Sequence, residues 1–324
     1  MAPARESFLP DDARYLFPDT ISRQAADGFA VLHAYYSQAV SAPDSLEEWD
    51  RRHQAIEHNV LQMSPSTELP TTLLGGVDVI RVPGSNPRAH SPVLIYVHGG
   101  GHTWLSARST LLVSKLMAEA SGYEVISVDY TVAPRGKWHK QSAQVIAVYE
   151  ALLSEGHAPA HIGMFGDSAG GGLAAGSVLR MRAQGIPLPG ALLLLSPWSD
   201  VTGRGDSYTT LAAYDPMLTY YDLKICADAY ADPADQRHPY VSPVYGDYSK
   251  PFPPTLIQGG TRELLLSDFV RHYQAIKSGG HEVTLDLYEG MAHAFHTLAP
   301  TAPEVIECFA TAARFWRSRL SAGG

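Results

Sequence analysis

The stretch that decides the fold is His161-Ile162-Gly163-Met164-Phe165-Gly166-Asp167-Ser168-Ala169-Gly170-Gly171. A short apolar run ends at Gly166, and an Ala- and Leu-rich helical pattern begins directly after Ser168. Gly-x-Ser-x-Gly between a strand and a helix is typical of a nucleophile elbow, a sharp turn with the serine at its apex. Glycines let the two arms of such a turn approach closely, and N–H groups at the helix start can bind an oxyanion. The pattern predicts that Ser168 is a nucleophile.

Two other interpretations of this stretch have to be weighed. Gly-Asp-Ser-Ala-Gly-Gly is similar to the Gly-Asp-Ser-Gly-Gly of chymotrypsin-like proteases, but those proteins are all-β and place His and Asp before the serine. The second alternative is a glycine-rich turn that contains a serine by chance. The rest of the chain decides between them, because a nucleophilic serine needs a base, an orienting acid and oxyanion donors.

Composition limits the classes of protein to consider. With 324 residues the chain suits one large α/β domain with an insertion or lid. A net charge of −9 argues against nucleic acid or an anionic membrane surface as partner. Only two cysteines, Cys226 and Cys308, are present, which excludes a disulfide scaffold. No signal-peptide pattern is seen, and the longest aliphatic run, 191–195, is too short to span a bilayer. We therefore expect a soluble, cytoplasmic protein without membrane insertion.

Strand and helix patterns alternate along most of the chain. Such alternation predicts an α/β fold with a mostly parallel central sheet and helices on both faces. Expected strands are a pair within 73–82 and single strands at 93–97, 125–128, 162–165, 191–195, 255–258 and 283–288; expected helices cover 110–120, 142–153, 265–278 and 302–320.

Two segments depart from this alternation. Residues 1–65 carry helical patterns without strands, and residues 201–250 are irregular apart from one helical pattern at 221–230. The N-terminal helices cannot bury their apolar faces alone. We expect both segments to form a helical cap on a core of residues 66–200 and 251–324, together a single structural domain with a lid.

The base expected for Ser168 is His293. In the chain order typical of α/β-hydrolases the serine comes first, then the acid, then the histidine. His293 lies in the loop after the last expected strand, 283–288, where a neutral imidazole could accept the serine proton. His296, three residues further on, is the alternative.

The acid should follow the preceding strand, 255–258. Two carboxylates are available there: Glu263 in the loop and Asp268 inside the expected helix. The role requires only a carboxylate that fixes the tautomer of the histidine. Glu263 is the preferred candidate, and Asp268 stays open as the alternative.

Oxyanion donors are expected in His98-Gly99-Gly100-Gly101-His102, directly after the strand at 93–97. Glycines allow close approach of backbone N–H groups to a substrate carbonyl. The Lys-Ser/Thr of a phosphate-binding loop and the G-x-G-x-x-G of a dinucleotide site are absent, whereas His-Gly-Gly-Gly is the pattern of lipases and esterases. No His-Glu-x-x-His occurs, and we expect neither a catalytic metal nor a cofactor.

With these motifs the sequence resembles the hormone-sensitive-lipase-like family of α/β-hydrolases, in its bacterial carboxylesterase branch, over roughly residues 70–320. Two further stretches match signatures of that family: Asp129-Tyr130 with Ala133-Pro134, and Ser196-Pro197-Trp198-x-Asp200. The resemblance implies the α/β-hydrolase fold and a cap that shapes the acyl and alcohol pockets.

The resemblance also assigns roles to particular residues. It implies a triad of Ser168, Glu263 and His293 and an oxyanion hole made by the N–H groups of Gly100, Gly101 and Ala169, with His98, Gly99 and Asp167 as the supporting loop. Three features depart from the family pattern. Glu263 stands where Asp is usual, the loop 131–138 is different, and Ala294 replaces a glycine after His293.

The expected function is a serine carboxylesterase that hydrolyses small esters through an acyl-enzyme, with a preference for short to medium acyl chains implied by the family. A lactone, carbamate or amide could be the substrate of the same triad. A protein of another class, a non-catalytic receptor for a small ligand on a hydrolase scaffold, is the third possibility. A homodimer is a reasonable expectation.

Overall fold

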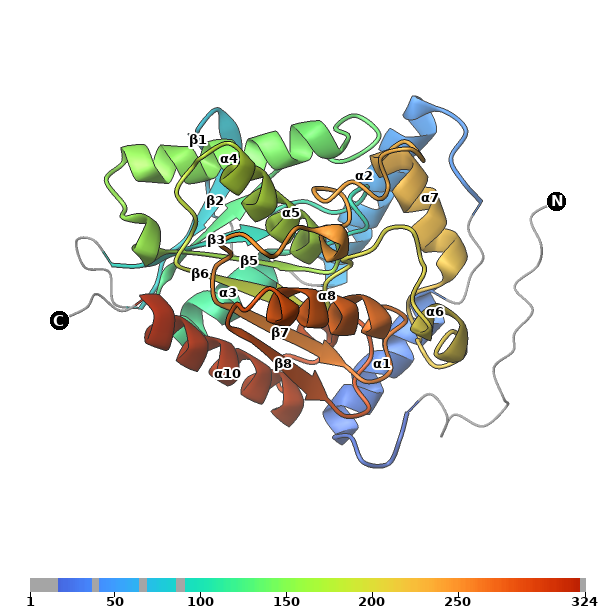
Figure 1. Cartoon of the computed structure of the whole chain (residues 1–324). Coiled ribbons are helices and arrows are strands. Elements are labelled where there is room, and N and C mark those ends of the chain that lie inside the picture. Colours follow the sequence, from blue (N-terminus) through green and yellow to red (C-terminus); the bar gives the residue numbers. More distant parts are fainter. Residues whose placement is uncertain (1–16, 37–40, 64–68, 86–90, 321–324) are drawn as a thin grey trace.

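One eight-stranded sheet organises the computed structural model, which describes residues 17–36, 41–63, 69–85 and 91–320. Its strands are β1 (Thr71–Leu74), β2 (Val77–Val82), β3 (Val93–Val97), β4 (Glu124–Val128), β5 (Ile162–Asp167), β6 (Ala191–Leu195), β7 (Thr255–Gly260) and β8 (Val283–Tyr288). The order across the sheet is β1-β2-β4-β3-β5-β6-β7-β8 (Figure 1). The first two pairings, β1 with β2 and β2 with β4, are antiparallel, and all others are parallel.

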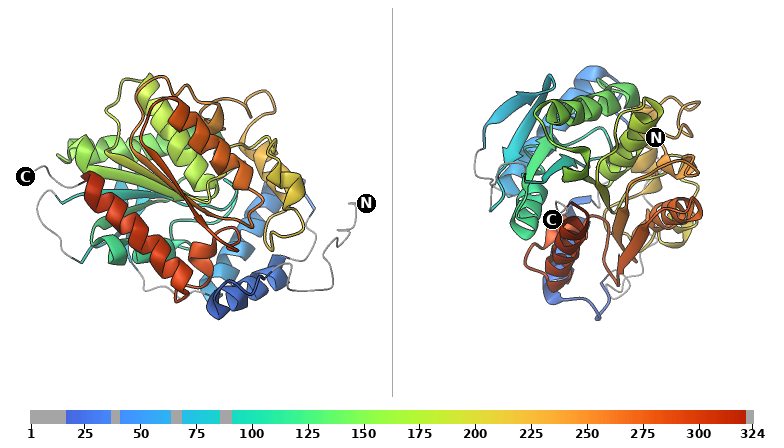
Figure 2. Two further views of the ribbon diagram at one scale, coloured as in Figure 1. Left: turned by 60° about the horizontal axis from the view of Figure 1, so that its bottom comes forward. Right: turned by 60° about the vertical axis from the view of Figure 1, so that its left-hand side comes forward.

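Helices cover both faces of the sheet, as the sequence predicted. Figure 2 shows α3 (Leu111–Ser121) and α10 (Pro303–Leu320) on one face, with α4 (Trp138–Ser154), α5 (Ala169–Ala183) and α8 (Leu266–Ser278) on the other. Strands β3, β5, β6 and β7 are buried at every position. In β3, Val93, Ile95 and Val97 join the apolar cluster on the α4–α5 side, whereas Leu94 and Tyr96 join the cluster under α3 and α10. Continuous apolar runs therefore reflect burial on two faces.

Further helices come from the two segments expected to form the cap. They include α1 (Arg23–Tyr36) and α2 (Leu46–Met63) near the N-terminus, and α6 (Ser207–Thr210) and α7 (Tyr220–Tyr230) between β6 and β7. In Figure 1 all four lie toward the side to which the arrowheads of β7 and β8 point. Residues 1–16, 37–40 and 64–65 of the expected N-terminal cap lie outside the described residues. In the described part of the chain, no helix is both long and apolar enough to cross a membrane.

Most expected elements occur near their predicted positions, and the differences are local. Helix α4 begins at Trp138, four residues before the predicted start. The prediction missed this first turn because its buried positions include a polar residue, Gln141, which interrupts the apolar pattern. The short helices η2 (Pro159–His161), η3 (Pro243–Tyr245), α6 and α9 (Phe295–Leu298) were not predicted, since three or four residues are too few to show a helical period.

Candidate active site

Ser168 lies at the sharp turn between β5 and α5. Its backbone has φ 52° and ψ −123°, a conformation that non-glycine residues rarely adopt. The turn is tight because its flanking glycines touch other backbone. A Cβ on Gly166 would stand 2.4 Å from the carbonyl oxygen of Gly170, and one on Gly170 would stand 2.0 Å from that of Val97. Only glycine fits at these two positions, and the strained turn brings Ser168 to the carboxyl edge of the sheet.

Three side chains from separate loops form one hydrogen-bonded line. His293, after β8, has its Nε2 2.9 Å from Ser168 Oγ and its Nδ1 2.8 Å from Oε2 of Glu263, after β7. An ionised carboxylate can only accept, so Nδ1 carries a proton and Nε2 is free to accept the hydroxyl proton of Ser168. All three side chains are buried. The arrangement can remove a proton from the serine and retain it nearby.

The hydrogen bond and charges of the Glu263–His293 pair favour the charged form of each side chain, whereas burial opposes charge on both and leaves the pKa of Glu263 raised. Burial raises the pKa of Glu263, while hydrogen bonds from His293, the Gly260 N–H and the Ser196 hydroxyl act in the opposite direction. The Ser196 hydroxyl donates to Glu263 Oε1 at 2.7 Å. Burial lowers the pKa of His293, but the hydrogen bond and charge of Glu263, together with the charges of Asp215 and Asp167, outweigh it and leave that pKa raised. The imidazolium form is therefore stabilised where it would be needed.

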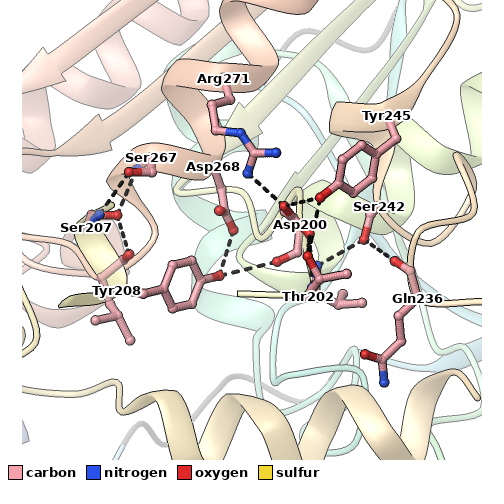
Figure 3. A network of polar contacts seen from close by, with 12 residues as sticks. Asp200, Thr202, Ser207, Tyr208, Gln236, Ser242, Tyr245, Ser267, Asp268 and Arg271 are labelled. Carbon is pink, nitrogen blue, oxygen red and sulfur yellow. Dashed lines mark hydrogen bonds and ion pairs between the residues drawn. The ribbon is translucent and has the colours of Figure 1, made fainter. Parts of the chain in front are cut away.

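The structure separates the two acid candidates. Asp268 lies in α8, where Oδ2 accepts the hydroxyl of Tyr208 at 2.8 Å, and nearby Asp200 pairs with Arg271 at 2.7 Å (Figure 3). Glu263, in the loop before α8, is the carboxylate that contacts His293. Asp268 thus belongs to a buried network that joins α8 to the segment between β6 and β7.

The alternative base is also placed elsewhere. His296 is fully buried, and its Nε2 lies 3.9 Å from Asp167 Oδ2. Burial lowers its pKa to about 4. It is His293 that contacts Ser168.

The glycine loop after β3 runs beside this line of side chains. Gly100 and Gly101 have φ of 103° and 61°, which glycine adopts without strain. The N–H groups of Thr103 and Trp104 donate to the Gly100 carbonyl at 3.1 and 2.8 Å and close a turn. Ala169 begins α5, whose N-terminus carries a positive dipole.

His98 and Tyr130 support the start of the loop. His98 Nδ1 lies 2.8 Å from the Gly99 carbonyl oxygen, so this nitrogen carries a proton and donates. The Tyr130 hydroxyl donates to the His98 carbonyl oxygen at 2.7 Å, and the two rings stack with centroids 4.1 Å apart. Burial lowers the pKa of His98. A neutral His98 therefore braces the loop.

Both expected cap segments contact this region. The Trp49 ring of α2 stacks on Trp104 at 4.8 Å, and a Cβ on Gly101 would stand 2.9 Å from Cys226 Sγ of α7. The divergent loop 131–138 also reaches them: Arg135 Nε donates to Asp50 of α2 at 2.8 Å, and the Trp138 indole donates to Asp235 at 3.2 Å. The divergent loop thus connects to both segments, as the glycine loop does.

Sequence reasoning missed two residues of the site. Ser196 follows β6, which pairs with β7, the strand that precedes Glu263. The family signature that contains Ser196 could therefore have placed it beside Glu263. Asp215, whose carboxylate accepts the N–H of Leu264 at 2.8 Å, lies in the irregular segment and gave no signal. Across the described ranges, no group of three or more His, Cys, Asp or Glu side chains is arranged to hold a metal ion.

Comparisons with known proteins agree with this fold. Residues 94–297 match the family model described as alpha/beta hydrolase fold. An acetyl-hydrolase of Streptomyces hygroscopicus is 34% identical over 236 residues, 73% of this chain and 79% of that protein. An esterase of Acinetobacter venetianus is 30% identical over 250 residues, 76% of this chain and 82% of its own.

Solved structures extend the likeness to nearly the whole chain. An esterase from the bacterial hormone-sensitive lipase family has a TM-score of 0.84 and 28% identity, covering 93% of this chain and 99% of that one. Esterase E25 has a TM-score of 0.85 and 27% identity, covering 94% and 97%. The chain belongs to the hormone-sensitive-lipase-like family of α/β-hydrolases, as the sequence motifs predicted. It is a carboxylic ester hydrolase.

Proposed function

We propose that this ester hydrolase works through an acyl-enzyme on Ser168 and acts on esters of short to medium acyl chains. The observation that supports the mechanism is the continuous line from Ser168 Oγ to His293 Nε2 at 2.9 Å and from His293 Nδ1 to Glu263 Oε2 at 2.8 Å. Three groups so connected match the roles of nucleophile, base and orienting acid.

In the first half of the proposed reaction Ser168 Oγ attacks the ester carbonyl while its proton moves to His293 Nε2. The N–H groups of Gly100, Gly101 and Ala169 stabilise the oxyanion of the tetrahedral intermediate. The intermediate then collapses, the bond to the alkoxy oxygen breaks, and His293 gives its proton to the departing alcohol. Glu263 stabilises the transient imidazolium throughout.

In the second half water attacks the acyl-enzyme and gives a proton to His293. The bond between the acyl carbon and Ser168 Oγ breaks, and His293 returns the proton to the serine. The carboxylic acid leaves and ionises in water.

The preference for short acyl chains rests on relatives. One similar protein is named an acetyl-hydrolase, and a similar structure, EstE5, was soaked with p-nitrophenyl butyrate. We propose that α1, α2 and residues 201–250 form a cap that limits the acyl pocket, since both segments pack on the glycine loop and its neighbours. A homodimer and a cytoplasmic location stay predictions, to be tested by light scattering and cell fractionation.

A panel of p-nitrophenyl esters from acetyl to palmitoyl, with lactones beside it, tests the proposal. Ser168→Ala should lower kcat by about 10⁴-fold or more while the protein stays folded. The rate should be highest with acetyl to butyryl chains. Full turnover by Ser168→Ala would contradict the mechanism, and a rate that rises toward palmitoyl would contradict the substrate class. Small-ligand binding without acylation by an organophosphate would point to a receptor.

A further inference from the structure

Both backbone groups of Leu264, the residue after Glu263, are held by side chains from the segment between β6 and β7. The Leu264 N–H donates to Asp215 Oδ2 at 2.8 Å. The Ser207 hydroxyl donates to the Leu264 carbonyl oxygen at 2.7 Å. All of these groups are buried. The main chain next to Glu263 is therefore fixed by two residues that precede Leu264 by 49 and 57 positions in the sequence.

The same segment holds the following turn as well. The Ser207 and Ser267 residues exchange two hydrogen bonds, each from a backbone N–H to the other hydroxyl oxygen at 2.9 Å. Next to them the Tyr208 hydroxyl donates to Asp268 Oδ2 at 2.8 Å (Figure 3). These contacts dock the start of α8 and lie beyond Glu263. Asp215 differs from them because it binds the residue next to Glu263 and because its charge acts on His293.

The environment of Asp215 fits an ionised carboxylate. Its Oδ1 accepts the N–H groups of Met217 and Leu218, each at 2.9 Å, in addition to the Leu264 N–H at Oδ2. All three partners are donors, as an acceptor-only carboxylate requires. Burial raises the pKa of Asp215 above its usual value, and the charge of His293 and the three N–H groups limit that rise without cancelling it.

Asp215 acts on His293 together with two other carboxylates. Glu263 from the loop after β7, Asp215 from the segment between β6 and β7, and Asp167 from the end of β5 all favour the protonated imidazole. His296 of α9 also interacts electrostatically with His293, so a positive charge on either imidazole disfavours protonation of the other. Arg262, next to Glu263, places its guanidinium 5.7 Å from the ring centroid of Tyr214.

We propose that Asp215 is a positioning residue for the reaction: its carboxylate fixes the main chain that carries Glu263, and its buried negative charge stabilises the imidazolium formed at His293. A buried charge interacts more strongly than one in water, so it can assist without touching the substrate. The segment between β6 and β7 then has two tasks, to cover the site and to hold its acid. This inference rests on the proposed function, because it assumes that His293 is the base.

The test compares Asp215→Asn with Ser207→Ala, using the pH dependence of kcat and kcat/KM on p-nitrophenyl acetate. Asp215→Asn removes the charge at nearly constant volume. Its kcat should fall about 10- to 100-fold with KM changed less than about 3-fold, as for a small displacement of catalytic groups. The acid limb of kcat/KM should move to lower pH, because His293 loses a stabilising charge. Ser207→Ala releases the other backbone group of Leu264 without a charge change, so its kcat should fall less and its acid limb should stay in place.

Two results would overturn the proposal: wild-type kcat in Asp215→Asn, or an acid limb of that variant at the wild-type pH. If Asp215→Asn does not fold, as judged by thermal unfolding, Asp215→Ser is measured against the same two criteria, since its small neutral side chain leaves room for water at the Leu264 N–H. Ser168→Ala is assayed in parallel. Activity that survives without Ser168 would refute the proposed function itself, whereas a normal Asp215→Asn beside an inactive Ser168→Ala refutes only the role of Asp215.

Discussion

The carboxylate of Asp167 links the serine turn to the glycine loop: its Oδ1 accepts the N–H of Gly99 at 2.9 Å. The same oxygen accepts the hydroxyl of Tyr96 from β3 at 2.6 Å. The approach is close, since a Cβ on Gly99 would stand 2.5 Å from Asp167 Oδ2. The residue before Ser168 therefore sets the position of the loop proposed to hold the oxyanion.

Asp167→Ala should lower both stability and activity. It leaves two buried donors, the Gly99 N–H and the Tyr96 hydroxyl, without their acceptor, and each such loss costs about 1–3 kcal/mol. We expect the free energy of unfolding in urea to fall by about 2–6 kcal/mol. The loop that carries Gly100 and Gly101 would shift, so kcat on p-nitrophenyl acetate should fall about 10- to 100-fold. Tyr96→Phe, the control, should keep kcat near wild type. Unchanged kcat in Asp167→Ala would contradict the link.

Gly170→Ala should destabilise the protein strongly although alanine favours helices. Its Cβ would stand 2.0 Å from the Val97 carbonyl oxygen and 2.4 Å from that of His98, so the serine turn would have to move away from β3. We expect a loss of about 3 kcal/mol or more in urea unfolding. Gly76→Ala is the matched control, because no atom lies within 4 Å of its Cβ and only its φ of 76° is unfavourable. That variant should lose about 1–2 kcal/mol. Equal losses in both variants would show that crowding at Gly170 is unimportant.

The strands and the serine turn could be predicted because their signals are local. Continuous apolar runs such as 93–97 and 191–195 mark strands buried on two faces. These two runs form β3 and β6, respectively, at the predicted residues. The spacing of glycines around Ser168 is likewise visible in the local sequence, although the backbone that crowds Gly170 belongs to Val97 and His98 of the neighbouring strand and loop. Fold class therefore followed from patterns shorter than one element.

The acid and the contacts of the cap segments could not be fixed in this way. Glu263 and Asp268 both follow β7, and the choice depends on where α8 begins and on Ser196 from the neighbouring strand. Arg135 and Asp50 are 85 positions apart, and exposed polar pairs of this kind have no periodic signature. Which side chains become partners depends on how distant segments pack in the folded protein, and a single sequence does not contain a local signal for that packing.

In the pH dependence of wild-type kcat/KM, the apparent pKa of the acid limb should lie above the ordinary value for histidine. Burial lowers the pKa of His293, but the hydrogen bond and charge of Glu263, with the charges of Asp215 and Asp167, leave it above the ordinary value of 6.5. Attack by Ser168 needs neutral His293, so activity is present above this pKa and is lost as the pH falls through it. Glu263→Gln removes the largest of the opposing charges. Its acid limb should therefore move to lower pH, and its kcat should fall about 10³- to 10⁴-fold because the tautomer is no longer fixed. A profile of Glu263→Gln whose acid limb coincides with that of the wild type would show that Glu263 does not set the protonation of His293.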